Sequence, residues 1–209
     1  MRDPVAMGAP VEDVPGSADW LTDVERERAA RFVRDADRRS FVAAHLLVRH
    51  CAAAYLGVPP EKVTLLQHCD VHGAGHGRPY LEHAPEVGVS LSHTRGYVCA
   101  AVGHGRVGID AEQVKPGPVD EGLAGQALTD GERALVSGNE GLIRIWARKE
   151  ALIKRGELTL DRLREVDLSK LAAAERQEWQ GRHLLEWTAP GPVLVTVITD
   201  RPATRKPIK

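Results

Sequence analysis

Six residues near the middle of the chain, Val107-Gly108-Ile109-Asp110-Ala111-Glu112, constrain the fold most. Val107 and Ile109 favour an extended strand, and Asp110 and Glu112 project from its opposite face because strand side chains alternate. Two neighbouring carboxylates on an otherwise apolar strand repel each other unless a cation lies between them. Mg²⁺ commonly takes one or two carboxylates and fills its other positions with water and phosphate. The hexapeptide therefore predicts a strand that offers a metal site, and a strand end whose acids face water is the alternative.

A second group of charged residues falls on a predicted helix from about 140 to 155. Trp146, Glu150 and Lys154 follow one another at intervals of four, so they lie along one stripe of this helix. An ordinary surface pair of Glu150 and Lys154 is the plain alternative. The rest of the helix is so apolar that it must be packed, and we favour a functional site. Three carboxylates and one lysine suit metal-assisted phosphoryl chemistry.

The N-terminal region predicts two helices, over about 22–33 and 36–56, the second ended by Gly57. Arg39 and Ser40 lie at the start of this second, packed helix. A fork of donors and a hydroxyl at that place can hold a phosphate.

The middle of the chain predicts short strands and the turns between them. The sequence Gly-His-Gly-Arg-Pro-Tyr at 75–80 is typical of a tight turn, and Arg78 on it is a candidate anion contact. Ser92 and His93 point to opposite faces of a strand end, so they suit phosphate binding rather than a nucleophile and base pair. Residues 103–105 are the natural hinge between two halves. The strands are predicted at 63–66, 87–91 and 97–102.

The last part of the chain mixes a loop, a short helix and further strands. Residues 113–125 are rich in proline and glycine and are predicted to be a loop. A capping box at Thr129 opens a helix that Gly138 closes. Strands are predicted at 166–168, 183–188 and 193–199, followed by a frayed basic tail at 201–209.

Composition excludes several other classes of protein. With 43% hydrophobic and 27% charged residues, the chain is typical of an ordinary globular protein. A net charge of −1 argues against non-specific nucleic-acid binding. The three separated cysteines imply no disulfide framework. The N-terminus lacks the apolar stretch of a signal peptide, and no segment approaches the ~20 apolar residues of a membrane span. We therefore expect a cytoplasmic protein with no membrane or nucleic-acid partner.

Three blocks of the sequence resemble the signature motifs of the 4′-phosphopantetheinyl transferases, in the order and spacing of the surfactin-type class. The resemblance covers roughly residues 22–200 and implies an α+β fold of two pseudo-symmetric halves, 1–104 and 105–209. Each half would pack helices on a small, mainly antiparallel sheet, with the active site at the junction. The blocks are Ser90-Leu91-Ser92-His93, Val107 to Glu112, and Trp146 to Lys154.

The resemblance also implies an activity and a set of site residues. The chain, expected to be a monomer, would use Mg²⁺ to transfer the 4′-phosphopantetheine group of coenzyme A to a serine of an apo acyl or peptidyl carrier protein, releasing 3′,5′-ADP. Asp110, Glu112 and Glu150 would hold the metal, and Glu150 would be the base. Lys154 would contact the phosphates. The coenzyme contacts, mainly around the 3′-phosphate, would be Arg39, Ser40, Arg78, Ser92 and His93.

The chain departs from the family pattern at two places, and two other functions would use similar residues. Relatives carry a Gly-x-Gly-Leu loop where this chain has Arg155-Gly156-Glu157-Leu158, and Glu25 stands where relatives have a basic phosphate contact, with Arg28 as the alternative. A metal-dependent nuclease would also use carboxylates and a lysine, but position 152 is leucine where such a lysine is common, and aromatic content is only 4%. A non-catalytic module that only binds a nucleotide is the second competitor.

Overall fold

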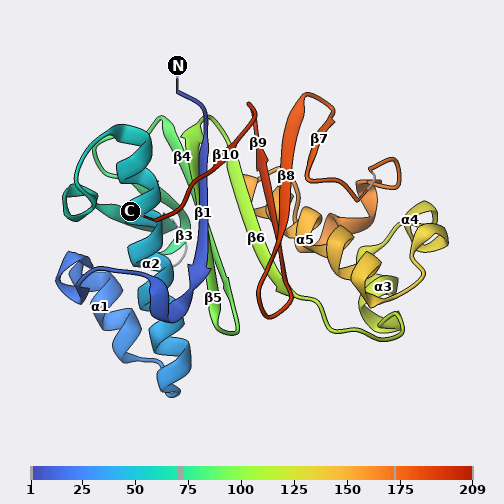
Figure 1. Ribbon diagram of the computed structural model, residues 1–209, viewed down its shortest axis with the longest axis horizontal. Helices are drawn as coiled ribbons and strands as arrows, with labels where there is room; N and C mark the ends of the chain where they lie inside the picture. The colour runs from blue at the N-terminus through green and yellow to red at the C-terminus, as the bar shows by residue number, and fades with distance from the viewer. Residues whose placement is uncertain (1, 70–72, 172, 209) are drawn as a thin grey trace.

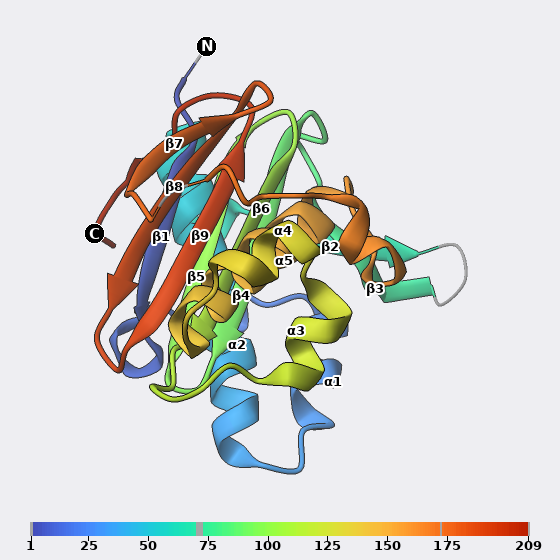
Figure 2. The same cartoon turned by 90° about the vertical axis from the view of Figure 1, so that its right-hand side faces the viewer.

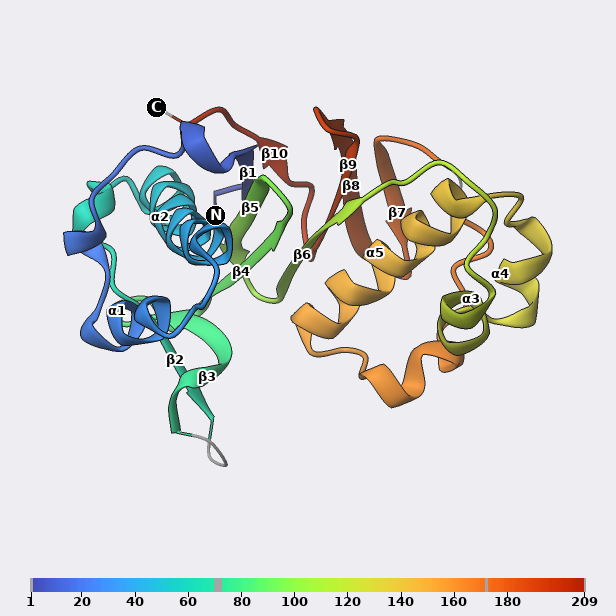
Figure 3. The same cartoon turned by 90° about the horizontal axis from the view of Figure 1, so that it is seen from below.

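The structure is a computed structural model that describes residues 2–69, 73–171 and 173–208. Two sheets face each other in the middle of the molecule, and helices cover the outer face of each, which gives four layers (Figures 1 and 3). The first sheet contains every strand up to His104, and the second every strand from Val107 to Thr199. The predicted α+β class and its two halves are confirmed. The division after residue 104 stays a proposal, because strand β10 near the C-terminus joins the first sheet.

The first half is built on a long helix that packs against a sheet of six strands in the order β10-β1-β5-β4-β3-β2. Residues of α2 that recur at helical spacing, Ala44, Leu47, Val48 and Cys51, are buried against the inner strands. Gly57 ends α2 in the left-handed conformation, as predicted. The elements are α1 (Asp23–Ala30), α2 (Asp35–Leu56), β1 (Val5–Pro10), β2 (Leu65–Cys69), β3 (Gly73–Leu81), β4 (Val87–Thr94), β5 (Tyr97–His104), β10 (Thr204–Arg205) and the 3₁₀ helices η1 (Val11–Asp13), η2 (Ala18–Trp20) and η3 (Pro60–Lys62).

The second half repeats this plan with a sheet of four strands in the order β6-β9-β8-β7 and α5 as its packed helix. Leu142 and Leu152 of α5 are buried with Leu184 and Ile198 of the sheet. Helices α3, α4 and α5 cover this sheet from outside (Figure 2). The elements are β6 (Val107–Gln113), α3 (Glu121–Ala127), α4 (Asp130–Leu135), α5 (Asn139–Arg155), η4 (Leu160–Glu165), β7 (Arg176–Trp179), β8 (Arg182–Ala189) and β9 (Val193–Thr199).

The two sheets bury a common apolar layer between them. Tyr97, Cys99 and Ala101 of β5 share this layer with Ile109 of β6 and Val195 of β9. The alternation predicted for the hexapeptide explains it: Ile109 enters the layer between the sheets, whereas Asp110 faces the opposite way. The halves are therefore joined by a continuous core as well as by the chain.

The prediction of a tight turn at 75–80 is wrong, because these residues belong to strand β3. The glycines still disturb the strand. Gln67 pairs with Pro79, but the next residue of β2, His68, pairs with Ala74, so 75–78 bulge out of the ladder. The carbonyls of Gly75 and Gly77 in this bulge accept hydrogen bonds from Arg28 and Gln67. The local preference for a turn is thus expressed inside a longer hairpin.

Three other predictions are wrong. Residues 166–168 form no strand, since η4 ends at Glu165 and the following residues run on without pairing. Helix α3 begins at Glu121, within the predicted loop, because Asp120 caps it by accepting from the N–H of Leu123. The tail is predicted to be frayed over 201–209, but its described part, 201–208, pairs with the sheet: the N–H groups of Thr204 and Lys206 donate to the carbonyls of Pro4 and Ala6, and β10 extends the first sheet. No helix in the described part of the chain is long and apolar enough to cross a membrane.

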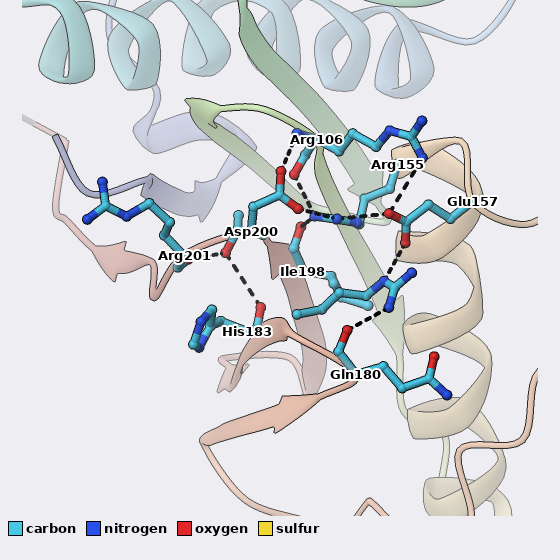
Figure 4. A network of polar contacts seen from close by, with 10 residues as sticks. Arg106, Arg155, Glu157, Gln180, His183, Ile198, Asp200 and Arg201 are labelled. Carbon is cyan, nitrogen blue, oxygen red and sulfur yellow. Dashed lines mark hydrogen bonds and ion pairs between the residues drawn. The ribbon is translucent and has the colours of Figure 1, made fainter. Parts of the chain in front are cut away.

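A buried arginine at the end of α5 ties the second half to the connection between β5 and β6 (Figure 4). The Arg155 guanidinium donates to the carbonyls of Arg106 and Ile198 and to the carboxylates of Glu157 and Asp200. Glu157 in turn accepts from Arg182 at 2.7 Å. Burial alone would raise the pKa of Glu157, but the hydrogen bonds from Arg155 and Arg182 outweigh it and hold that pKa below its ordinary value of 4.5.

We expect Glu157→Gln to lower the free energy of unfolding by about 1–2 kcal/mol at neutral pH. A carboxylate with a lowered pKa stabilises the folded state above its unfolded pKa, and this contribution is lost as the pH falls through the folded pKa. Urea unfolding should therefore show a difference between the two proteins at pH 7 that shrinks toward about pH 3. Glu165→Gln is the control, since Glu165 forms an exposed pair with Arg162, and it should change little at either pH.

Candidate active site

A close contact between β6 and α5 brings the predicted acids and lysine together. A Cβ at Gly108 would lie 1.9 Å from the carbonyl oxygen of Ala151, so only glycine lets the strand approach the helix this closely. Asp110 lies two residues further along β6, and Glu150 and Lys154 flank Ala151 on α5. The glycine inside the hexapeptide therefore sets the distance between the two motifs.

Lys154 binds Asp110 rather than Glu150. The Lys154 Nζ donates to Asp110 Oδ1 at 2.7 Å and to Ser92 Oγ at 2.7 Å, and the Ser92 hydroxyl donates to the same Asp110 oxygen at 2.9 Å. Asp110 and Ser92 are both buried. The structure thus brings together residues from all three sequence blocks, and the surface pair that Glu150 and Lys154 offered as an alternative is absent from the described part of the chain.

Glu112 and Glu150 lie beside this cluster. The indole N–H of Trp146, the tryptophan of the predicted stripe, donates to Glu112 Oε1 at 2.8 Å and so orients this carboxylate. Burial raises the pKa of Glu112, the charge of Asp110 raises it further, and the Trp146 hydrogen bond and Lys154 oppose both. Burial and then Asp110 also raise the pKa of Glu150, against a smaller opposing effect of Lys154. The three carboxylates are therefore close enough to repel one another.

The three carboxylates supply the oxygen donors that suit a divalent cation, although their side chains do not converge on one point. Among the residues that the structure describes, no three acidic, histidine or cysteine side chains lie together as a formed metal site. Asp110 Oδ2, however, is buried without a hydrogen-bond partner in the described chain. A buried carboxylate oxygen without a partner, next to two further carboxylates, offers the type of oxygen donor that a hard cation takes.

A cavity of about 410 Å³ opens beside Lys154 and is walled by both halves. Arg28, Arg78 and Lys154 make it cationic, and an anionic ligand suits such a site. Its lining includes Arg28, Phe41, His45, Gln67, Gly77, Arg78, Pro79, Ser90, Leu91, His93, Ile153 and Lys154.

His93 lines this cavity, whereas its neighbour Ser92 lies outside the cavity lining. Ser92 is buried against Asp110, whereas part of the His93 ring is exposed. Partial burial lowers the pKa of His93, and the charges of Lys154 and Arg28 lower it further while Asp37 opposes them. The opposite orientations predicted for the dipeptide are therefore seen, and each residue lies at a different part of one site.

Two predicted coenzyme contacts lie elsewhere. Arg39 and Ser40 line a different, largely apolar cavity of about 800 Å³. The Arg39 guanidinium pairs with Asp35 at 3.4 Å, and the Ser40 hydroxyl donates to the carbonyl of Ala36 at 2.9 Å. The structure does not bring this pair to the cavity beside Lys154, because the two residues face another side of α2.

Sequence reasoning missed Phe41 and His45, which do line the cavity. Both had a signal in their four-residue spacing on α2, but that spacing indicated only a packed face. The two rings lie 4.0 Å apart, and burial lowers the pKa of His45 to about 4, so its ring is neutral at neutral pH. Arg28 lies over the Phe41 ring, at 5.4 Å from its centre. The arginine that sequence reasoning kept as an alternative therefore does reach the site.

Glu25, the acid that replaces a basic residue of the family pattern, has a structural role. Its carboxylate accepts from both Nη1 and Nη2 of the fully buried Arg49, at 3.0 and 2.6 Å. It also accepts from the N–H of Thr22 in the predicted capping box. Removing either member of this pair would leave a buried charge without its partner.

Comparisons with known proteins match both halves of the chain. The family model described as 4′-phosphopantetheinyl transferase, N-terminal, matches residues 12–104, and the model of the 4′-phosphopantetheinyl transferase superfamily matches residues 106–189. Both models describe the same family, and the residues that they match adjoin each other between β5 and β6, where the two similar halves of the fold also meet. Together they define the class of protein. The chain belongs to the 4′-phosphopantetheinyl transferase superfamily, and it resembles the surfactin-type class.

Two curated relatives agree with this assignment. The chain is 25% identical over 138 residues to a 4′-phosphopantetheinyl transferase of Bacillus subtilis, covering 63% of this chain and 58% of the relative. It is 27% identical over 136 residues to the 4′-phosphopantetheinyl transferase psf-1 of Bacillus pumilus, covering 62% of this chain and 55% of the relative. The match thus spans little more than half the length of these curated relatives.

Proposed function

We propose that this protein transfers the 4′-phosphopantetheine group of coenzyme A to a serine of an apo acyl or peptidyl carrier protein. The observation that carries the proposal is the cationic cavity between the halves, which opens beside the cluster of Asp110, Lys154 and Ser92. Membership of the superfamily supports it. We extend the proposal to a cytoplasmic monomer that serves polyketide or nonribosomal peptide biosynthesis.

The residues divide into a binding group and a reacting group. Arg28, Arg78 and His93 would bind the phosphates at the coenzyme's nucleotide end, since they line the cavity. Lys154 would leave Asp110 for the pyrophosphate. The carboxylates that would hold Mg²⁺ are Asp110, Glu112 and Glu150. When bound there, the ion would supply positive charge that neutralises the pyrophosphate oxygens.

The reaction requires one proton acceptor, and Glu150 fits that role. The hydroxyl oxygen of the carrier serine forms a bond to the β-phosphorus of coenzyme A, and the bond from that phosphorus to the bridging oxygen breaks. The serine proton passes to the Glu150 carboxylate, and 3′,5′-ADP leaves. In the protein without bound metal, burial and then the charge of Asp110 raise the pKa of Glu150, which favours proton uptake by this carboxylate.

A direct test is to incubate the protein with coenzyme A, Mg²⁺ and an apo carrier protein, and to measure the mass of the carrier. We expect the mass to increase by one phosphopantetheine group. Carrier lacking the acceptor serine and reactions with a chelator are the controls. Binding of coenzyme A without any mass increase would favour the non-catalytic module, and cleavage of nucleic acid would favour the nuclease.

We expect His93→Ala to raise the KM for coenzyme A by about tenfold or more with little change in kcat. The imidazole borders the cavity without contacting the acid cluster, so it should contribute to binding rather than to the chemical step. Steady-state kinetics with coenzyme A and with dephospho-coenzyme A test this. The second substrate lacks the 3′-phosphate and should be insensitive to the substitution; equal losses with both would assign His93 to another part of the coenzyme.

A further inference from the structure

The guanidinium of Arg78 fills the place of a missing side chain in the other half of the protein. Gly156 follows α5, and a Cβ built on it would lie 1.7 Å from Nη2 of Arg78 and 2.8 Å from Nη1. Any side chain at position 156 would therefore have to displace the guanidinium. The contact joins β3 of the first half to the end of α5 in the second.

Gly156 is held firmly by the chain on both sides of it. Its backbone adopts φ +74°, and its N–H donates to the carbonyl of Ile153 at 2.7 Å. The neighbouring Arg155 and Glu157 are fixed by the buried network with Asp200, Ile198 and Arg182 (Figure 4). We call the space beside Gly156, where a Cβ would lie in any other residue, the slot. Because the backbone around Gly156 is fixed by these contacts, the slot exists independently of Arg78.

The Arg78 guanidinium occupies this slot. It lies in the bulge of β3, whose carbonyls are fixed by Arg28 and Gln67, so its backbone is well placed. Its side chain is exposed, and within the described residues it has no hydrogen bond or ion pair. The C-terminal end of α5 favours a nearby cation. The donors of Arg78 are left available to the cavity that Lys154 also lines.

We propose that Gly156 is a positioning residue that sets the place of Arg78 for coenzyme binding. The inference rests on the proposed function, because it assigns Arg78 to the phosphates of coenzyme A. It also gives a purpose to the Gly156 that this chain keeps in the shortened Arg155-Gly156-Glu157-Leu158 segment. The far end of an arginine moves at little cost in stability, so a side chain at position 156 should weaken binding more than it weakens the fold.

The test is a double-mutant cycle of Arg78→Ala and Gly156→Ala, read by calorimetric titration with coenzyme A in the absence of a carrier protein. We expect each single variant to raise the Kd by about tenfold, as for loss of a charge-assisted hydrogen bond. The double variant should bind no more weakly than Arg78→Ala alone, since Gly156 acts through the arginine. Steady-state kinetics should show the same losses in KM rather than in kcat.

Two further variants separate the slot from backbone strain. Gly57 also follows a helix in the left-handed conformation, with φ +80°, and its nearest neighbour is Arg2, at 3.2 Å from a built Cβ. Gly57→Ala should lower the Tm by about 2–4 °C and leave the Kd unchanged. Gly156→Asn tolerates the left-handed backbone better than alanine but still fills the slot, so it should bind as weakly as Gly156→Ala.

The possible results are distinct. Gly156→Ala and Gly156→Asn with wild-type Kd, or additive losses in the double variant, would overturn the positioning role. An unchanged Kd in Arg78→Ala, with the carrier still modified, would overturn the inference and leave the proposed function standing. A wild-type protein that fails to modify the carrier would count against the proposed function, whereas the coupling of Arg78 and Gly156 would still be measurable in coenzyme binding.

Discussion

Asp110→Asn should reduce turnover by at least about 10²–10³-fold while the protein still folds. The wild-type carboxylate accepts from both Lys154 and Ser92 through Oδ1 and keeps Oδ2 buried and free. Asparagine preserves the size of the side chain, but it carries no charge and can offer only one acceptor oxygen. Both the cation and Lys154 would lose their common partner. Measurement of kcat at saturating coenzyme A, with unfolding followed in parallel, tests this.

Stability should move in the opposite direction from the one that the sequence suggests. Two adjacent acids on a strand imply that removing one relieves repulsion, yet the structure places the ammonium of Lys154 on Asp110. Asp110→Asn should therefore lower the free energy of unfolding, by about 1 kcal/mol because Lys154 is partly exposed and can turn toward water. The exposed Asp3→Asn, at a carboxylate with no hydrogen bond or ion pair among the described residues, is a control for charge alone. An Asp110→Asn enzyme with near wild-type turnover would remove this residue from the metal site.

The local pattern of residues was enough to predict the elements that carry the chemistry. Alternation in the hexapeptide predicted β6 and its acidic face, and the four-residue spacing of Trp146, Glu150 and Lys154 predicted the packed α5. Both predictions depend on short-range geometry, which the chain imposes on itself. The capping box at Thr129 was predictable for the same reason, and its hydrogen bonds are present in the structure.

Features that depend on distant partners could not be predicted. Nothing near Lys154 indicates that its partner is Asp110 rather than Glu150, because that choice is made by the close packing of Gly108 on Ala151. The tail gains order only because the edge of β1 is free to pair with it. Arg39 and Ser40 have suitable chemistry for a phosphate, but the rotation of α2 against its sheet turns them to another cavity. Long-range packing decides each of these cases.

Glu150→Gln should separate catalysis from stability more cleanly than any other substitution in this site. Within the described residues, Glu150 forms no hydrogen bond or ion pair, and burial and Asp110 disfavour its charge, so its replacement by glutamine should raise the free energy of unfolding slightly rather than lower it. Glutamine keeps the shape of the side chain but removes its charge and nearly all of its basicity. If Glu150 is both metal ligand and base, turnover should fall by about 10²–10⁴-fold even at saturating coenzyme A. Glu140→Gln, on the exposed first turn of the same helix, is the matched control and should remain active.

The same helix offers a second, independent check through Lys154. Lys154→Ala should also lower kcat, because an ammonium aimed at phosphate oxygens is most useful as charge develops on the departing 3′,5′-ADP. Unlike Glu150→Gln, it should reduce stability as well, since Asp110 would be left buried without its cation. The two losses in turnover should combine to less than their product, because both residues serve one transition state. Fully multiplicative losses would mean that the residues act in separate steps, and near wild-type turnover in Glu150→Gln would return that residue to an ordinary place on the helix surface.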